Sequence, residues 1–244
     1  MSVRAAAVLP AAGAGRRMGG VRKPFLELAG EPMLLHAVRP FLAHRAVEWV
    51  VVVLAPEDAS QPPAWLMALD PRVRVVAGGT ERGDSVRHGL EAVPEEADVV
   101  LIHDAARPLV TVAEVERAVA AAAQGVGAVI AVPVVDTLKQ ADERGHVIGT
   151  RDRGGLWQAQ TPQAFPRAMI VEAYRRAARE GVAATDDAAL VERYGGDVVL
   201  IEGSRANIKV TTPHDLELAR AVLAARRGAP QAGEATWTAT HRLP

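Results

Sequence analysis

A glycine-rich stretch near the start of the chain, PAAGAGRRMGGVRKPF at residues 10–25, combines small residues with four cations. The cations are Arg16, Arg17, Arg22 and Lys23. Glycines allow a tight turn and a close approach of the backbone to a ligand, and clustered cations attract anions. The first acidic residue is Glu27, so no earlier residue can neutralise the cluster. The stretch therefore predicts a loop that binds a polyanion such as a triphosphate.

This loop differs from both common phosphate-binding motifs. The chain contains no GxxxxGK[ST] sequence, which the P-loop requires. Gly13, Gly15 and Gly19 give GxGxxxG, one residue longer than the dinucleotide fingerprint. That fingerprint also uses a helix N-terminus rather than side-chain cations. The spacing therefore argues against a dinucleotide-dependent dehydrogenase.

The elements that must position this loop follow an alternating pattern. Apolar runs rich in valine and isoleucine predict strands at 4–10, 48–56, 73–79, 98–104 and 127–134, with late strands at 197–203 and 207–211. Helical patterns cover 32–44 (with a break expected at Pro40), 84–93, 111–123, 166–180, 185–195 and 213–227. Strands that are apolar without alternation are typical of parallel sheets buried on both faces. We expect a three-layer, Rossmann-like α/β fold with a mostly parallel sheet and a ligand at the carboxyl ends of its strands.

Residues 134–160 do not follow the alternation of apolar strands and helices. They are polar, and a turn at 143–145 separates two extended patterns, which predicts a protruding β-hairpin arm. Such an arm can be buried only against another chain or across its own active site. We expect one domain over 1–227, with 134–160 as a dimerisation arm, and a disordered tail over 228–244.

The composition excludes several classes of protein. The 244 residues have a net charge of −1 and no cysteine, and 49% of them are hydrophobic. A balanced charge gives no general attraction to nucleic acid or acidic membranes, and without cysteine there is neither a disulfide framework nor thiolate chemistry. No apolar run reaches the ~18 residues that a membrane span needs. We expect a cytoplasmic protein with no nucleic-acid or membrane partner.

Several motifs together resemble one known family. PAAGAGRRM followed by Lys23 is similar to the start of a sugar-nucleotide nucleotidyltransferase. The further motifs are GGTERGDSV (78–86), LIHDAARP (101–108), PVVDTLK (133–139), LWQAQTPQ (156–163), ATDDA (184–188) and NIKVT (207–211). Over about residues 5–226 they resemble the 2-C-methyl-D-erythritol 4-phosphate cytidylyltransferases. The chain departs from many members at Pro24, where they have glutamine, and from some at Thr80, where they have an acid.

The resemblance implies a reaction between CTP and 2-C-methyl-D-erythritol 4-phosphate, which releases pyrophosphate and belongs to the non-mevalonate route to isoprenoids. It also implies Mg²⁺ or another divalent cation, and a homodimer that exchanges its arms. The attacking phosphate is already ionised at neutral pH, so catalysis needs cations, a metal ion and positioning more than proton transfer. The sequence agrees with this, because it has no GxSxG motif and no histidine cluster at metal-ligand spacing.

The resemblance assigns residues to three roles. The catalytic residues are Arg17 and Lys23, which stabilise the transition state, and Arg153 and Lys209, which grip the substrate phosphate. The nucleotide-binding residues are Ala11, Ala12, Gly13, Gly15, Gly79, Ser85 and Asp104. The substrate-binding residues are Asp104, Arg107, Thr137, Arg153, Thr185 and Lys209. Asp104 is also the one candidate metal ligand, with the CTP phosphates supplying most of the coordination.

Plainer interpretations stay open beside these roles. Lys23 could be a solvated lysine, Arg153 an arm salt bridge, and Asp104 a turn cap. Thr185 and Ser85 could be residues of helix N-termini, and we interpret His103 as a packed imidazole. For the whole chain, the alternatives are a cytidylyltransferase for another polyol phosphate, such as ribitol 5-phosphate, and a non-catalytic nucleotide-binding regulator.

Overall fold

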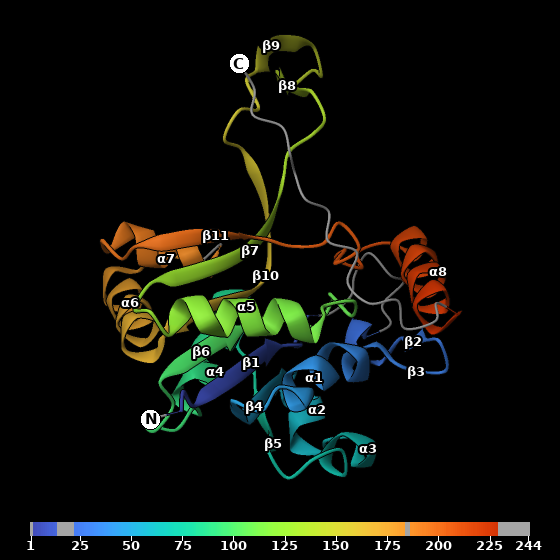
Figure 1. Cartoon of the computed structure of the whole chain (residues 1–244), viewed down its shortest axis with the longest axis vertical. Coiled ribbons are helices and arrows are strands. Elements are labelled where there is room, and N and C mark those ends of the chain that lie inside the picture. Colours follow the sequence, from blue (N-terminus) through green and yellow to red (C-terminus); the bar gives the residue numbers. More distant parts are fainter. Residues whose placement is uncertain (1, 14–21, 184–185, 229–244) are drawn as a thin grey trace.

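A seven-stranded sheet forms the centre of the computed structural model, which describes residues 2–13, 22–183 and 186–228 (Figure 1). Its strands, in spatial order, are β11 (Val198–Glu202), β7 (Gly127–Pro133), β10 (Trp157–Pro166), β6 (Val99–Ile102), β1 (Ala5–Pro10), β4 (Val47–Leu54) and β5 (Val73–Ala77). Within this sheet β10 pairs antiparallel with β6 and β7, and the other pairings are parallel. The predicted, mostly parallel α/β sheet is confirmed.

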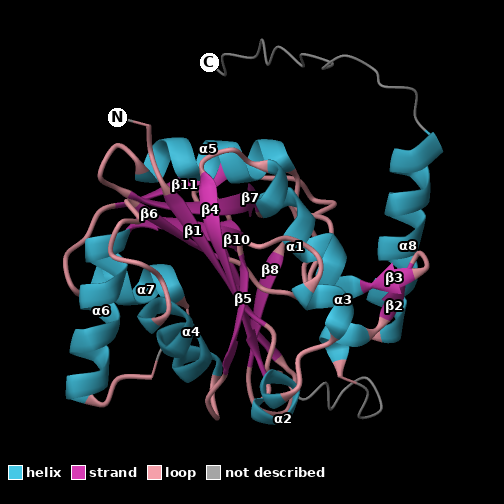
Figure 2. Ribbon diagram, turned by 90° about the horizontal axis from the view of Figure 1, so that it is seen from below, coloured by secondary structure: helices cyan, strands magenta, loops and turns pink. Residues whose placement is uncertain are grey.

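Both faces of the sheet are buried, which explains the continuous apolar runs of its strands. Along β1, Ala5, Ala7 and Leu9 enter one core, and Ala6 and Val8 enter the other. Side chains alternate along a strand, so a core on each side requires an apolar residue at every position. The helices lie in two layers (Figure 2): α1 (Met33–Ala43) and α5 (Val112–Ala122) cover the first face, and α4 (Arg82–Glu91), α6 (Arg167–Glu180) and α7 (Asp187–Arg193) cover the second.

A smaller apolar cluster packs the last helix against the segment around residues 28–33. Leu28, Met33, Leu109, Val210 and Leu216 are buried together in it. The elements that it connects are α8 (Pro213–Gly228) and the ribbon of β2 (Glu27–Leu28) and β3 (Glu31–Pro32). The remaining short helices are η2 (Lys23–Phe25), α2 (Pro56–Ser60) and α3 (Ala64–Met67). None of the described helices has the length and apolar character that a membrane crossing needs.

The predicted hairpin arm is present, but its predicted end at residue 160 is wrong, because residues 157–160 already belong to β10 in the middle of the sheet. Strands β8 (Leu138–Ala141) and β9 (Val147–Arg151) pair antiparallel, and the hairpin projects far beyond the sheet from the ends of β7 and β10 (Figure 1). Val147 and Ile148 are 61% and 60% exposed, so the arm presents apolar side chains that nothing in the described part of this chain covers.

Two local expectations are wrong. The segment 207–211 is not a strand: it forms no ladder, and the side-chain amide of Asn207 instead donates to the carbonyl of Thr161 at 2.9 Å. This side chain ties the segment to β10, so the segment does not need a neighbouring strand. The helix that was expected to break at Pro40 continues to Ala43, because buried side chains such as Val38 and Phe41 hold it against the sheet on both sides of the proline.

The ends of two other predictions also shift. Asp186, rather than Thr185, is the N-cap of α7, and its carboxylate accepts from the backbone N–H of Ala189. Thr185 lies outside the described residues. The predicted tail starts one residue too early, because Gly228 still belongs to α8, and residues 229–244 lie outside the described residues.

Candidate active site

A cavity of about 570 Å³ lies at the carboxyl ends of β1, β5 and β6. Its lining comes from the loop after β1, from η2, from the connection between β5 and α4, from the loop after β6, and from Lys209. These segments carry four of the motifs that the sequence singles out, although they are far apart along the chain. Parallel strands end at the same edge of the sheet, and this places the motifs together, as the sequence predicts.

Tight packing shapes the backbone beside this cavity. A Cβ added at Gly78 would lie 2.7 Å from Ala12 Cβ and from Ser85 Oγ, and one added at Gly79 would lie 2.3 Å from Asp84 Cβ. The backbone N–H of Gly79 donates to Ser85 Oγ at 3.2 Å, and that hydroxyl donates to the carbonyl of Glu81 at the same distance. The two glycines therefore let the loop reach the wall of the cavity, and Ser85 fixes its path.

Asp104 is the centre of the charged side chains in the cavity. Its Oδ2 lies 2.6 Å from Nζ of Lys209, and its Oδ1 accepts from Nε of Arg82 at 3.1 Å. Burial would raise the pKa of Asp104, but the charges and hydrogen bonds of Arg82 and Lys209 outweigh it and hold that pKa well below its usual range. Asp104 is therefore an anion at any physiological pH, and it fixes the Lys209 ammonium at the edge of the cavity.

A second carboxylate, that of Asp187, also pairs with Arg82. Arg82 makes a two-pronged ion pair with Asp187, at 3.0 Å and 2.7 Å, and the hydroxyl of Tyr174 donates to Asp187 Oδ1 at 2.6 Å. Asp187 is completely buried. Burial would lower the pKa of Arg82, but Asp187 and Asp104 raise it overall. The pair is well matched in geometry, so Arg82 has one fixed orientation.

His103 precedes Asp104 in the chain and is fully buried. The backbone N–H of Asp104 donates to Thr161 Oγ1, whose hydroxyl is then available to donate to Nδ1 of His103 at 2.9 Å. Nε2 of His103 lies 3.0 Å from the carbonyl of Arg107, which can only accept. This assigns a neutral imidazole with its proton on Nε2, and burial lowers the pKa of His103 to about 4. The interpretation of His103 as a packed imidazole is confirmed.

Arg107 is not among the residues that line the cavity. Its guanidinium donates to the carbonyl of Asn207 at 2.8 Å and to that of Ala159 at 3.4 Å, and burial lowers its pKa. It therefore ties the segment that carries Lys209 to β10. A direct contact between Arg107 and a substrate stays a prediction.

The structure brings together part of the predicted site. The residues that line the cavity are Ala11, Ala12, Gly13, Lys23, Gly79, Ser85, Asp104 and Lys209. Nζ of Lys23 donates to the carbonyl of Val210 at 3.3 Å. Arg16, Arg17, Gly15 and Thr185 lie outside the described residues. The two arm residues are placed elsewhere: Arg153 is exposed and donates to the carbonyl of Val135, and Thr137 is also exposed in the arm, so neither lines the cavity of its own chain.

The donors in this cavity do not form a metal site of their own. Among the described residues, no group of three or more histidine, aspartate or glutamate side chains is placed to hold a metal ion. Both oxygens of Asp104 already contact cations. A divalent ion would therefore take most of its ligands from a bound polyphosphate, and coordination by Asp104 would require it to release Arg82 or Lys209.

The sequence analysis gave no role to Arg82 and Asp187. Both lie inside quoted motifs, Arg82 in GGTERGDSV and Asp187 in ATDDA. Their charge does not single them out, because both motifs contain other charged residues, and 105 positions separate the two. Only the fold shows that they are partners.

Comparisons with known proteins point to one family. The family model described as IspD, 2-C-methyl-D-erythritol 4-phosphate cytidylyltransferase, matches residues 5–225. A curated 2-C-methyl-D-erythritol 4-phosphate cytidylyltransferase from Syntrophotalea carbinolica is 48% identical, over 88% of this chain and 94% of that protein. One from Streptomyces coelicolor is 47% identical, over 92% of this chain and 86% of that protein.

Solved structures give the same result. The crystal structure of 2-C-methyl-D-erythritol 4-phosphate cytidylyltransferase from Thermus thermophilus has a TM-score of 0.76 and 34% identity, over 89% of this chain and 98% of that chain. The 4-diphosphocytidyl-2C-methyl-D-erythritol synthase from Anaerococcus prevotii has a TM-score of 0.81 and 28% identity, over 91% of this chain and 96% of that chain. The Rossmann-like class of the fold is thereby confirmed, and the chain belongs to the 2-C-methyl-D-erythritol 4-phosphate cytidylyltransferase family.

Proposed function

We propose that the cavity at the carboxyl ends of β1, β5 and β6 performs the activity of this family of nucleotidyltransferases. The chain joins CTP to 2-C-methyl-D-erythritol 4-phosphate and releases pyrophosphate, a step of isoprenoid biosynthesis. The observation that carries this proposal is the convergence of Lys23, Lys209 and the Asp104–Arg82 pair on one cavity, beside a glycine-containing loop.

The chemistry requires two anions to be held together. A phosphate oxygen of the polyol phosphate attacks the α-phosphorus of CTP, a new P–O bond forms, and the bond to the bridging oxygen of the leaving pyrophosphate breaks. Lys23, at the start of η2, lines the cavity, and it would balance the negative charge that develops on the phosphoryl oxygens. Arg17 would act with it. A divalent cation, with Mg²⁺ as the candidate, supplies further charge neutralisation on the triphosphate when it is bound.

Lys209 and Asp104 would position the second substrate. Because Asp104 holds the Lys209 ammonium at 2.6 Å, this cation has a fixed place at the rim, where it can receive the polyol phosphate. The small residues that line the cavity would recognise the cytosine base. Ala12, Gly79 and Ser85 are small, so backbone groups can approach the edge of the base and reject bases that lack the matching groups. The Ser85 hydroxyl, which donates to the carbonyl of Glu81, would hold the backbone of this part of the cavity wall in place.

The arm would complete the site in a homodimer. Arg153 and Thr137 do not line the cavity of their own chain, and the arm exposes Val147 and Ile148, which pairing with a second chain would bury. We infer that the partner's Arg153 joins Lys209 at the substrate phosphate. The test mixes inactive Lys23→Ala and Arg153→Ala chains. Heterodimers should regain part of the activity, and isolated heterodimers with no activity would contradict an exchanged arm.

The test of the function is the release of pyrophosphate with purified protein, CTP and Mg²⁺. Activity with 2-C-methyl-D-erythritol 4-phosphate should exceed activity with D-ribitol 5-phosphate by at least about tenfold in kcat/KM, the effect of about 1.4 kcal/mol in barrier. A preference for ribitol phosphate would assign the chain to the alternative substrate. No turnover of either substrate, with CTP still bound, would favour a non-catalytic nucleotide-binding protein. A cytoplasmic location stays a prediction.

A further inference from the structure

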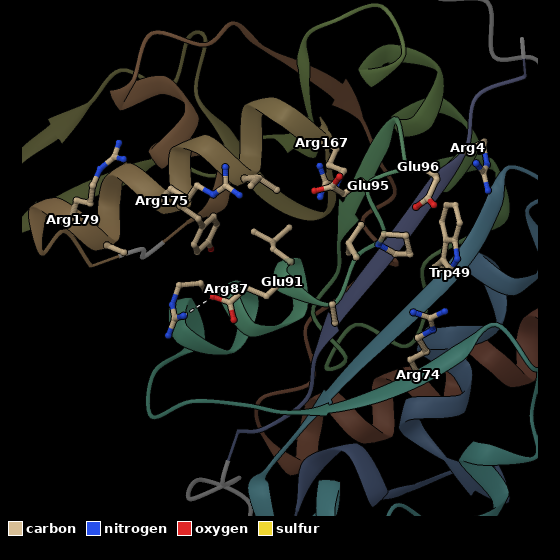
Figure 3. A pocket seen from close by; sticks show the side chains of 17 residues that line it. Arg4, Trp49, Arg74, Arg87, Glu91, Glu95, Glu96, Arg167, Arg175 and Arg179 are labelled. Carbon is tan, nitrogen blue, oxygen red and sulfur yellow. Dashed lines mark hydrogen bonds and ion pairs between the residues drawn. The ribbon is translucent and has the colours of Figure 1, made fainter.

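A second cavity, of about 920 Å³, lies at the opposite end of the sheet from the candidate active site. Its walls are α4 and α6, and it extends to the amino ends of β1, β4 and β5 (Figure 3). We call it the α4–α6 groove. In the part of the chain that the structure describes, it shares no lining residue with the cavity that carries the predicted motifs.

The α4–α6 groove is rich in arginine. Among the described residues that line it, three are glutamates and six are arginines, namely Arg4, Arg74, Arg87, Arg167, Arg175 and Arg179. Three of the arginines have carboxylate partners, namely Glu48 for Arg4, Glu91 for Arg87 and Glu172 for Arg179. Within the described part of the chain, no hydrogen bond or ion pair holds the guanidinium groups of Arg74, Arg167 and Arg175.

Arg167 is the most informative of these. It is only partly exposed, and its Nε is buried without a hydrogen-bond partner among the described residues. A buried donor without a partner destabilises the folded chain, and a partly buried charge without a paired carboxylate adds to that cost. An anion beside this guanidinium would lower the cost. Arg175 lies two turns further along the same helix, and both side chains border the groove (Figure 3).

Apolar side chains lie between the arginines. Leu90 and Tyr174 are almost completely buried and form part of the wall, with Val171 and Ala178 on α6. At the other end the Trp49 ring faces Arg4, whose guanidinium carbon lies 4.7 Å from the ring centre. A ligand that fits this lining must therefore satisfy cations and also cover apolar surface.

We propose that the α4–α6 groove binds a small organic phosphate with an apolar body. The phosphate would take two parallel hydrogen bonds from a guanidinium of Arg167 or Arg175, and the apolar body would cover Leu90 and Val171. The volume is within the range of small-molecule sites, which favours a free metabolite over a macromolecule. The exposed pair of Arg87 and Glu91 is weak, so Arg87 can also turn to the ligand.

The probe for this proposal is 1-naphthyl phosphate, titrated into the full-length protein and followed by calorimetry. It combines a phosphate with an apolar ring system and should bind with one site per chain. Inorganic phosphate and 1-naphthol, which each supply one half of the probe, should bind at least about tenfold more weakly. Saturating CTP should leave the affinity for the probe unchanged, because the groove and the proposed nucleotide site do not share residues.

Matched variants on α6 locate the binding. Arg175→Gln and Arg167→Gln should each raise the dissociation constant of the probe by about tenfold or more. Arg176→Gln, on the same helix, removes the same charge from a guanidinium that lies over the Tyr194 ring outside the groove, and it should have no effect. All three variants should keep the activity of the parent protein, which also shows that they fold.

Three results would overturn the proposal. Binding that survives both Arg167→Gln and Arg175→Gln would place the probe elsewhere. Loss of binding in the presence of CTP would place it in the other cavity. Equal affinity for inorganic phosphate would show that the apolar wall does not contribute.

Discussion

The candidate active site and the α4–α6 groove lie at opposite ends of one sheet, and they hold their charged side chains in different ways. In the candidate active site, Arg82 is fixed by Asp187 and Asp104, and Asp104 in turn fixes Lys209. In the α4–α6 groove, the guanidinium groups of Arg167 and Arg175 have no partner within the described residues. Charged side chains that pair with one another have fixed positions, and fixed cations suit a reaction between two bound anions. Unpaired charges suit the binding of an anion without chemistry.

The largest expected difference between the two regions is in stability. Asp187→Ala removes a completely buried carboxylate and leaves Arg82 with one partner, so we expect a loss of about 3–5 kcal/mol in the free energy of unfolding. Urea denaturation at pH 7 measures it. Glu172→Ala, which removes the exposed partner of Arg179 beside the groove, is the control and should cost little. Equal losses in the two variants would mean that the buried network does not differ from a surface pair.

The next effect is on the barrier of the reaction. Lys23→Ala should lower kcat by about 100- to 1000-fold, because removing one donor aimed at developing charge typically costs about 3–4 kcal/mol. The KM for CTP should rise much less. Release of pyrophosphate gives both constants, with Arg175→Gln in the groove as a variant that should retain full activity. An effect of Lys23→Ala on KM alone would reduce this residue to a binding role.

The response to acid should also separate the two regions. His103 is fully buried with its pKa lowered to about 4, whereas the groove has no histidine in its described lining. The unfolded chain takes up this proton near pH 6.5 and the folded chain only near pH 4, so stability is full above about pH 6.5. As the pH falls through this window, the protein should lose about 3 kcal/mol.

Urea denaturation between pH 7 and pH 4 measures this loss, and His103→Gln should flatten the profile over the same window. A His103 imidazole that titrates near its ordinary pKa in an NMR experiment would exclude the effect.

The smallest expected effect is in the groove. Glu91→Gln breaks its ion pair with Arg87, in which both side chains are substantially exposed, and it should cost at most about 1 kcal/mol. The same variant removes a negative charge from the groove, so it should tighten the binding of 1-naphthyl phosphate by a few fold. A weaker affinity for the probe would show that Glu91 orders the groove for its ligand, contrary to the charge argument.

Part of this molecule could be predicted locally. Thr111 and Glu114 have the spacing of a capping box, and the structure confirms it: each side chain accepts from the backbone N–H of the other residue. The apolar runs also predicted the sheet, because a strand that is buried on both faces has an apolar residue at almost every position. Segment 207–211 has the apolar pattern of a strand for a different reason: its apolar residues pack into the small cluster beside α8, without a neighbouring strand.

The sequence by itself determined most of the elements, the apolar layers and the segments that carry cations and glycines, because these depend on residue type and short spacings. It did not determine the polar strand β10, which the sheet pairing defines. Only the tertiary structure decided which charges meet. Arg82 and Asp187 are 105 residues apart in the sequence, and neither motif contains a feature that predicts their ion pair. The path of the whole backbone decides which charged side chains come into contact. Only the folded chain therefore shows that Lys209 pairs with Asp104. It also shows which arginines of the groove have no partner among the described residues.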